Sequence, residues 1–266
     1  MATASFVANW KMNKTLSESR DYLGKLQKLL PKRARPGEQV IVAAPYTALA
    51  SLFGWIKESS LEIGLAAQNL YFEAEGAYTG EISSSMLYDA GCRYAIVGHS
   101  ERRLHFGETD QIVAQKVATA QISHLVPILC IGETERERQQ GKTVSVIKRQ
   151  IRNGLCLGLT SEGGSESGPL DLSDCIIAYE PVWAIGTGKT PTSSDVEEVH
   201  QTLYTYLQSE GVEGMPGILY GGSVNEKNIS AFMKQPHIDG VLVGGASLSA
   251  ETFVQMIELG LEAKGL

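Results

Sequence analysis

The 266-residue chain lacks the features that mark proteins acting on nucleic acid or in membranes. It carries 23 Lys and Arg against 30 Asp and Glu, and the net charge of −7 lacks the basic excess that nucleic acid or an anionic membrane surface attracts. No apolar run approaches the roughly 20 residues needed to span a bilayer. The start, MATASFVANWK, has neither the basic nor the apolar stretch of a signal peptide. We therefore expect no nucleic-acid partner and no membrane partner.

The chain also lacks cysteine pairs with the spacing of a metal or redox site. Its four cysteines are Cys92, Cys130, Cys156 and Cys175, and none of them forms a CxxC pair. No Cys/His cluster has the spacing of zinc ligands either. We interpret the four as free, buried thiols in a reducing compartment, and we expect a cytoplasmic protein without a metal site.

What the chain does have is apolar material in short, repeated runs. Hydrophobic residues make up 43% of it and charged residues 20%, which is enough for a sizeable core. Eight runs rich in Val, Ile, Leu and Ala, without strict alternation, are typical of strands covered on both faces. Segments with helical spacing separate them, for example 17–30, 108–122, 144–159 and 194–208, where Thr192 or Ser193 can cap the last. The predicted strands are 5–10, 39–45, 62–69, 94–99, 125–132, 175–181, 217–223 and 240–247.

Eight strands that alternate with helices predict a parallel sheet, and right-handed crossovers favour its closure into an α/β, (β/α)8 barrel. An open doubly wound sheet is the structural alternative. That fold usually carries a glycine fingerprint after its first strand, whereas KMNKTLSES follows the first strand here. We expect a single domain over 1–266, with the polar, Gly/Ser-rich stretch 160–174 as a surface loop.

In such a barrel the chemistry lies at the carboxyl ends of the strands. Because side chains alternate along a strand, Asn9 and Lys11 share one face of the first run and are expected at the barrel mouth. Trp10 and Met12 share the other, apolar face, which we expect to pack under helices. The alternative for Lys11 is a lysine that merely reaches solvent from a strand end.

Two further strand ends carry groups suited to acid–base chemistry. The fourth run ends in His99, and a helix that starts at Ser100 would disfavour the protonated imidazole. A neutral imidazole can donate a hydrogen bond to a carbonyl oxygen, although a purely structural histidine is the alternative. The sixth run ends in Glu180, directly after CIIAY. Burial of a carboxylate is costly, so such a group needs either a partner that offsets the cost or a role in the chemistry of the site. A carboxylate shielded from water is a stronger base.

Glycine pairs follow the last two strands, at 221–222 before Ser223 and at Gly244–Gly245. They allow backbone N–H groups to approach an oxyanion, and phosphate sites in these barrels follow strands 7 and 8. Plain turn glycines are the alternative.

The stretch GTGKT after Glu180 suggests a nucleotide motif but does not fit one. A triphosphate-binding loop needs glycine at the position of Trp183, and the dinucleotide fingerprint needs glycine at the position of Pro191. We interpret the segment as a lid, stiffened by a proline at each end, whose glycines serve an anion.

Eight segments in chain order carry a more specific signal together than any one does alone. They are ANWKMN (8–13), AAQN (66–69), GAYTGEIS (76–83), IVGHSERR (96–103), CIGET (130–134), AYEPVWAIGTGKT (178–190), LYGGSV (219–224) and LVGGASL (242–248). These segments closely resemble the triosephosphate isomerase family. The resemblance implies interconversion of dihydroxyacetone phosphate and D-glyceraldehyde 3-phosphate, in glycolysis and gluconeogenesis, without a metal or organic cofactor. It also implies a homodimer, with the segment 68–85 and its Tyr78 reaching a partner subunit near Lys11.

The resemblance assigns a role to each residue noted above. Glu180 is expected to be the catalytic base and His99 the electrophile that polarises the substrate. Lys11 and Asn9 are expected to contact the substrate, and Glu101 is expected to support Lys11. The phosphate is expected to bind at Gly186, Ser223, Gly244 and Gly245, and residues 181–190 are expected to form a lid.

Two other functions remain possible from the residues alone. One is another phosphosugar enzyme on the same barrel, an epimerase or an aldolase. An aldolase needs a metal site or a Schiff-base lysine, for which Lys11 is the only strand-end candidate. The other is an inactive phosphate-binding or scaffold protein. Such a protein would be expected to have lost Glu180, His99 or Lys11, and all three are present.

Overall fold

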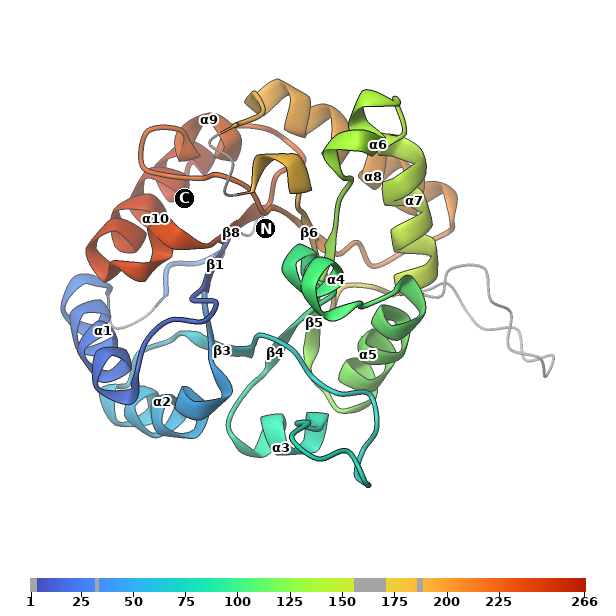
Figure 1. The fold of residues 1–266 in the computed structure, drawn as a ribbon. Helices are drawn as coiled ribbons and strands as arrows, with labels where there is room; N and C mark the ends of the chain where they lie inside the picture. Colours follow the sequence, from blue (N-terminus) through green and yellow to red (C-terminus); the bar gives the residue numbers. More distant parts are fainter. Residues whose placement is uncertain (1–3, 32–33, 156–170, 186–188) are drawn as a thin grey trace.

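Eight parallel strands form a closed barrel in the order β1 to β8, and helices surround it (Figure 1). The predicted (β/α)8 barrel is therefore confirmed. The computed structural model describes residues 4–31, 34–155, 171–185 and 189–266. The strands are β1 (Ala4–Asn9), β2 (Glu38–Ala44), β3 (Gly64–Ala67), β4 (Tyr94–Val97), β5 (Val126–Ile131), β6 (Ile176–Tyr179), β7 (Gly217–Tyr220) and β8 (Gly240–Val243).

The strands bury side chains on both faces, as their continuous apolar runs predicted. Val7, Ile41, Ile128 and Leu242 belong to a cluster inside the barrel. Phe6 and its alternating neighbours belong to a larger cluster between the barrel and the helices. The barrel is thus a packed core with its polar groups gathered at the strand ends.

The four segments predicted as helices are helical where the structure describes them, with small shifts at their ends. The segment predicted as 144–159 is helical to Gly154, and 156–159 lie outside the described residues. α1 (Leu16–Leu29) starts with a capping box between Thr15 and Glu18, and Thr192 caps α8 (Ser193–Ser209) as expected. The other helices are α2 (Tyr46–Ser59), α3 (Ser84–Asp89), α4 (Ser100–Phe106), α5 (Asp110–Ile122), α6 (Glu135–Gln139), α7 (Thr143–Gly154), α9 (Ile229–Met233) and α10 (Ala250–Lys264), with single 3-10 turns η1 (Val182–Ala184) and η2 (Gly245–Leu248).

Some strands are shorter at their carboxyl ends than the sequence predicted. β7 ends at Tyr220 and β8 at Val243, although the apolar runs suggested strands to 223 and 247. The glycine pairs begin turns at these points instead of continuing the ladder. Both turns therefore lie at the barrel mouth.

The prediction that Met12 packs under the helices is wrong. Trp10 is buried as expected, but the Met12 side chain is 97% exposed. Strand β1 ends at Asn9, and Lys11 takes a left-handed backbone conformation with φ 52°. The strand alternation on which the prediction rested has already stopped there.

Two other expectations from the sequence can be compared with the structure only over the residues that it describes. The stretch 160–174 lies outside the described residues up to position 170. No helix in the described ranges is long and apolar enough to cross a bilayer.

Candidate active site

A cavity of about 560 Å³ lies at the carboxyl ends of the strands. Segments that follow β1, β4, β6, β7 and β8 meet around it, although they are far apart in the sequence. The fold therefore brings together the strand-end residues noted from the sequence. Those that line the cavity are Asn9, Lys11, His99, Glu101, Glu180, Ser223, Gly244 and Gly245.

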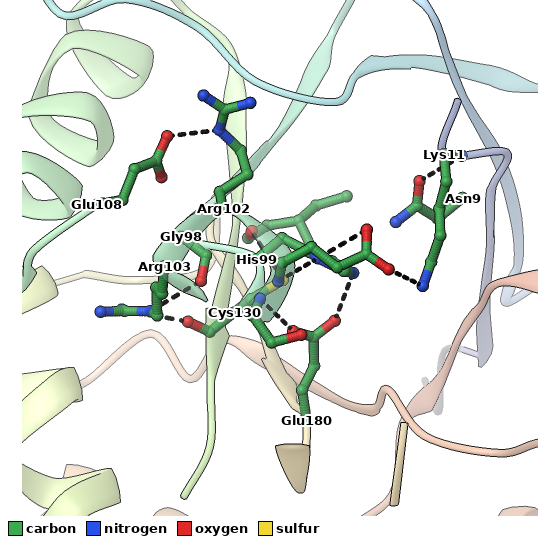
Figure 2. A network of polar contacts seen from close by, with 12 residues as sticks. Asn9, Lys11, Gly98, His99, Arg102, Arg103, Glu108, Cys130 and Glu180 are labelled. Atoms are coloured by element: carbon green, nitrogen blue, oxygen red, sulfur yellow. Dashed lines mark hydrogen bonds and ion pairs between the residues drawn. The ribbon is translucent and has the colours of Figure 1, made fainter. Parts of the chain in front are cut away.

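His99 and Glu180 face each other from neighbouring parts of the barrel (Figure 2). Nε2 of His99 lies 3.1 Å from Oε1 of Glu180. Their relative exposures are only 6% and 2%, so little water competes for this contact. An imidazole and a carboxylate in contact at the floor of a cavity can act together as a proton-transfer pair.

The imidazole of His99 is oriented by the helix that follows it. His99 is the N-cap of α4, and its Nδ1 accepts a hydrogen bond of 3.2 Å from the backbone N–H of Glu101. A nitrogen that accepts a hydrogen bond has no proton to donate, so the proton of the neutral ring lies on Nε2. That is the nitrogen directed at Glu180 and the cavity.

Glu180 is held by a donor that the sequence analysis did not identify. The backbone N–H of Ser100, in the first turn of α4, donates to Oε2 of Glu180 at 3.0 Å. A Cβ on Gly221 would lie 2.8 Å from the Cγ of Glu180, so only glycine leaves room for the carboxylate there. Burial, and then the Glu180 charge, raise the pKa of the Cys130 thiol well above its usual range. Cys130 is therefore a neutral neighbour of the carboxylate.

Lys11 is placed by its backbone and by two acceptors. A left-handed conformation is costly for a residue with a side chain, and such strain is often found at functional sites. The Oδ1 of Asn9 accepts from the Lys11 N–H at 3.0 Å, and Lys11 Nζ lies 2.5 Å from Oε1 of Glu101. Burial would raise the pKa of Glu101, but the hydrogen bond from Lys11 and the nearby charges hold it below its usual value. Glu101 is thus an anion that supports the lysine.

The turns after β7 and β8 also line the cavity. A Cβ on Gly244 would lie 3.2 Å from the Cε of Lys11, so this glycine lets the lysine stem pass close to the β8 turn. The hydroxyl of Ser223 donates to the carbonyl of Ala184 at 2.8 Å, which links the β7 turn to η1. The remaining expected phosphate contact, Gly186, lies outside the described residues.

The first turn after Glu180 is anchored by a second buried acid, Glu133. Its carboxylate accepts from the Tyr179 hydroxyl at 3.1 Å and from the Trp183 Nε1 at 2.9 Å, and its backbone carbonyl accepts from the Val182 N–H at 3.1 Å. Glu133 was not predicted from the sequence, although it follows β5 with only Gly132 between them. A similar signal, an acid close behind a buried strand, could have identified it.

The arginines after His99 support the site from outside. Arg102 pairs with Glu108 at 2.5 Å (Figure 2). Arg103 pairs with Asp110 at 2.6 Å. Within the described part of the chain, no group of three or more His, Cys, Asp or Glu side chains is arranged to hold a metal ion.

Fold and site together define a (β/α)8-barrel enzyme with a carboxylate–imidazole centre at its mouth. A family model described as triosephosphate isomerase matches residues 5–260. The chain therefore belongs to the triosephosphate isomerase family, and it is an enzyme of the isomerase class.

Individual relatives agree with this assignment along nearly the whole chain. The triosephosphate isomerase of Endomicrobium trichonymphae is 46% identical over 253 residues, which cover 94% of this chain and 96% of the relative. That of Moorella thermoacetica is 45% identical over 251 residues, covering 94% and 95%. The crystal structure of triosephosphate isomerase from Bartonella henselae superposes with a TM-score of 0.81 at 35% identity, covering 96% of this chain and 98% of that one.

Proposed function

We propose that the protein interconverts dihydroxyacetone phosphate and D-glyceraldehyde 3-phosphate through an enediolate. The observation that carries this proposal is the buried pair of Glu180 and His99, with Oε1 and Nε2 3.1 Å apart at the floor of the cavity. Membership of the family supports the choice of substrate, and the geometry of the site supports the roles that we propose for the residues.

Glu180 is the base in this proposal. Its carboxylate takes a proton from the hydroxyl-bearing carbon next to the carbonyl and returns it to the former carbonyl carbon. The hydroxyl proton passes from the first substrate oxygen to the second, and the two transfers together convert ketose to aldose. Its low exposure favours this role because a carboxylate shielded from water is a stronger base. Before it can reach a substrate carbon, the carboxylate must leave the Ser100 N–H, and the missing side chain at Gly221 gives it room to move.

His99 and Lys11 stabilise the charge that develops on the substrate oxygens. The neutral imidazole donates from Nε2 because its Nδ1 is occupied by the Glu101 N–H. The Lys11 ammonium, fixed by Glu101, adds a positive charge on the other side of the cavity. Both donors are in place before reaction, and such preorganisation lowers the barrier most where charge develops.

The phosphate of the substrate lies against the turns after β7 and β8 in this scheme. Ser223, Gly244 and Gly245 line that wall of the cavity. Backbone N–H groups at glycine turns can approach an oxyanion closely. Residues 181–190 then act as a lid, of which Gly186 contacts the phosphate, and closure excludes water from the enediolate.

The contacts of Lys11 argue against an aldolase. A Schiff-base lysine must be an unprotonated amine, whereas Lys11 is paired with an anionic Glu101. Borohydride reduction in the presence of dihydroxyacetone phosphate should therefore leave Lys11 unmodified in a mass spectrum.

An assay with D-glyceraldehyde 3-phosphate tests the proposed reaction. Purified, EDTA-treated protein should form dihydroxyacetone phosphate. Glycerol 3-phosphate dehydrogenase reduces this product, and the accompanying oxidation of NADH measures the rate. The EDTA treatment tests the expectation that neither a metal nor a cofactor is needed. Absence of turnover, or turnover only after a metal is added, would contradict the proposal.

The reaction places the protein in glycolysis and gluconeogenesis, which share this triose phosphate step. We further propose that it works in the cytoplasm, where these substrates occur, and that it acts as a homodimer.

A further inference from the structure

The β8 turn, residues 244–248, is held from behind by two side chains that come from the β1 side of the barrel. The hydroxyl of Tyr22, on α1, donates to the carbonyl of Ser247 at 2.8 Å. Nζ of Lys14, just before α1, donates to the carbonyl of Leu248 at 2.8 Å. The beginning of the same turn, Gly244 and Gly245, lines the cavity. One short turn is thus exposed to the cavity at its start and fastened at its end.

Lys14 is built into this position and does not simply extend into solvent. Its Nζ lies 4.6 Å from the ring centre of Tyr22 and 5.3 Å from that of Trp10, and these two rings pack edge to face. Its backbone is left-handed, with φ 76°. Burial lowers the pKa of Lys14 and the neighbouring Glu18 raises it, while burial raises the pKa of Tyr22 so that its hydroxyl stays a donor.

The other bonds of the β8 turn connect it mainly to its own strand. The hydroxyl of Ser247 donates to the carbonyls of Val243 and Gly244, and its N–H donates to Gly244. The parallel pairing of β8 with β1 runs from Ser5–Gly240 to Ala8–Val243 and so stops where the turn begins. Lys14 and Tyr22 therefore tie the turn to the β1 side beyond the end of the sheet.

We infer that Lys14 and Tyr22 are positioning residues that hold the β8 turn, and with it the phosphate contacts of Gly244 and Gly245, in register with Lys11. This inference rests on the proposed function, since it assigns the turn to the substrate phosphate. A Cβ built on Gly244 would lie 3.2 Å from the Cε of Lys11, so the β8 turn packs closely against the Lys11 side chain. A turn that is no longer fastened would change the phosphate contacts of Gly244 and Gly245.

Lys14→Met tests the inference because it keeps a straight side chain and the left-handed backbone but removes the ammonium. We expect KM for D-glyceraldehyde 3-phosphate and the inhibition constant of inorganic phosphate to rise together, by about tenfold. We expect kcat to stay within about threefold, because Glu180 and His99 are not touched. Tyr22→Phe should act in the same direction, and Lys14→Arg should restore most of the affinity.

Two controls separate positioning from general damage. Lys25→Met removes the same charge from the same surface depression, but Lys25 is exposed and pairs with the Glu251 side chain at 2.9 Å instead of with a carbonyl of the turn. This variant should behave as the unaltered protein. Turnover of D-glyceraldehyde, which has no phosphate, should be equal in Lys14→Met and the unaltered protein.

The outcomes distinguish the inference from the proposed function. If the unaltered protein isomerises the triose phosphate but Lys14→Met keeps its KM and phosphate inhibition, the inference is wrong and the function stands. An equal loss with D-glyceraldehyde would likewise refute it, since the damage would not concern the phosphate. If the unaltered protein does not isomerise the substrate, the proposed function fails, and calorimetric affinities for inorganic phosphate still decide whether Lys14 positions the turn.

Discussion

At the scale of single residues, Glu180 has partners for both of its carboxylate oxygens. Ser100 N–H and His99 Nε2 lie 3.0 Å and 3.1 Å from them. The side chain lines the cavity and is at the same time held at the N-terminus of α4. This arrangement makes the effect of removing the charge easy to interpret.

Glu180→Gln should lower kcat by about a thousandfold or more, because the amide keeps the shape but cannot accept a proton. The inhibition constant of inorganic phosphate should stay within about tenfold, since the phosphate wall is unchanged. Steady-state kinetics with an inhibition series measures both. A loss of only a few fold would place the base elsewhere.

The sequence could identify Glu180, His99 and Lys11 because each is a polar group at the end of an apolar run. It could not identify Ser100, whose contribution is a backbone N–H that any residue type could supply. Nor could it reveal that the Ser223 hydroxyl is bonded to Ala184, because that contact depends on how two turns meet in space.

At the scale of elements, the first turn of the lid segment has a buried anchor and its far end an exposed one. Glu133 is fully buried and binds Tyr179, Val182 and Trp183. At the far end, the exposed Lys189 pairs with the exposed Glu135. Exposed pairs contribute little, whereas a buried acceptor that loses its charge leaves its donors poorly paired.

Glu133→Gln should therefore lower kcat by about tenfold and increase the share of turnovers that release methylglyoxal and inorganic phosphate, because a loosened lid lets the enediolate phosphate eliminate. Glu135→Gln is the matched control and should stay within about twofold. NMR of the products from dihydroxyacetone phosphate gives both values. Equal effects of the two substitutions would show that the buried anchor does not control the lid.

The positions of the elements followed from apolar periodicity, but their ends did not. The sequence placed β8 as far as 247, whereas the strand ends at Val243. The residues after it are apolar enough to resemble a strand, yet the glycines allow a turn that Tyr22 and Lys14 then fasten. These fastening contacts join residues more than 200 positions apart, and local patterns carry no information about them.

At the scale of the whole molecule, several large apolar side chains of the mouth side are exposed. Met12 is 97%, Leu104 71%, Phe106 67% and Tyr78 41% exposed. An apolar surface of this kind is typical of a protein interface. It supports the expectation of a homodimer.

We expect the mass of a dimer by light scattering at micromolar concentration, and a shift toward monomer in Phe106→Glu. Ile122→Glu serves as the control, because Ile122 is 80% exposed but ends α5, at the opposite end of the barrel from the mouth. A fully active monomer would contradict the expectation. So would an equal shift in both variants.

A buried histidine on α8 makes stability depend on pH. His200, on α8, is fully buried, with Nδ1 2.9 Å from the carbonyl of His237. Burial lowers the pKa of His200 from 6.5 to about 4. The unfolded chain takes up this proton at a higher pH than the folded one, so stability falls as the pH drops from 6.5 toward 4. At about 1.4 kcal/mol per pH unit, the loss is at most about 3 kcal/mol.

His200→Gln should flatten this part of the stability curve, because glutamine does not titrate. Burial raises the pKa of Asp239, which acts in the opposite direction but is common to both proteins. Urea unfolding between pH 7 and pH 4 gives the two curves. The same slope in both would mean that another group takes up the proton.

The central claim is that Glu180 carries a proton between two substrate carbons, and NMR in D2O tests it most directly. A proton held by a carboxylate exchanges with solvent, so dihydroxyacetone phosphate incubated with the unaltered protein should give D-glyceraldehyde 3-phosphate carrying deuterium at C2 in a large share of the product. Glu180→Gln should abolish both the product and the exchange. Product formation and deuterium incorporation at an undiminished rate by Glu180→Gln would contradict the account.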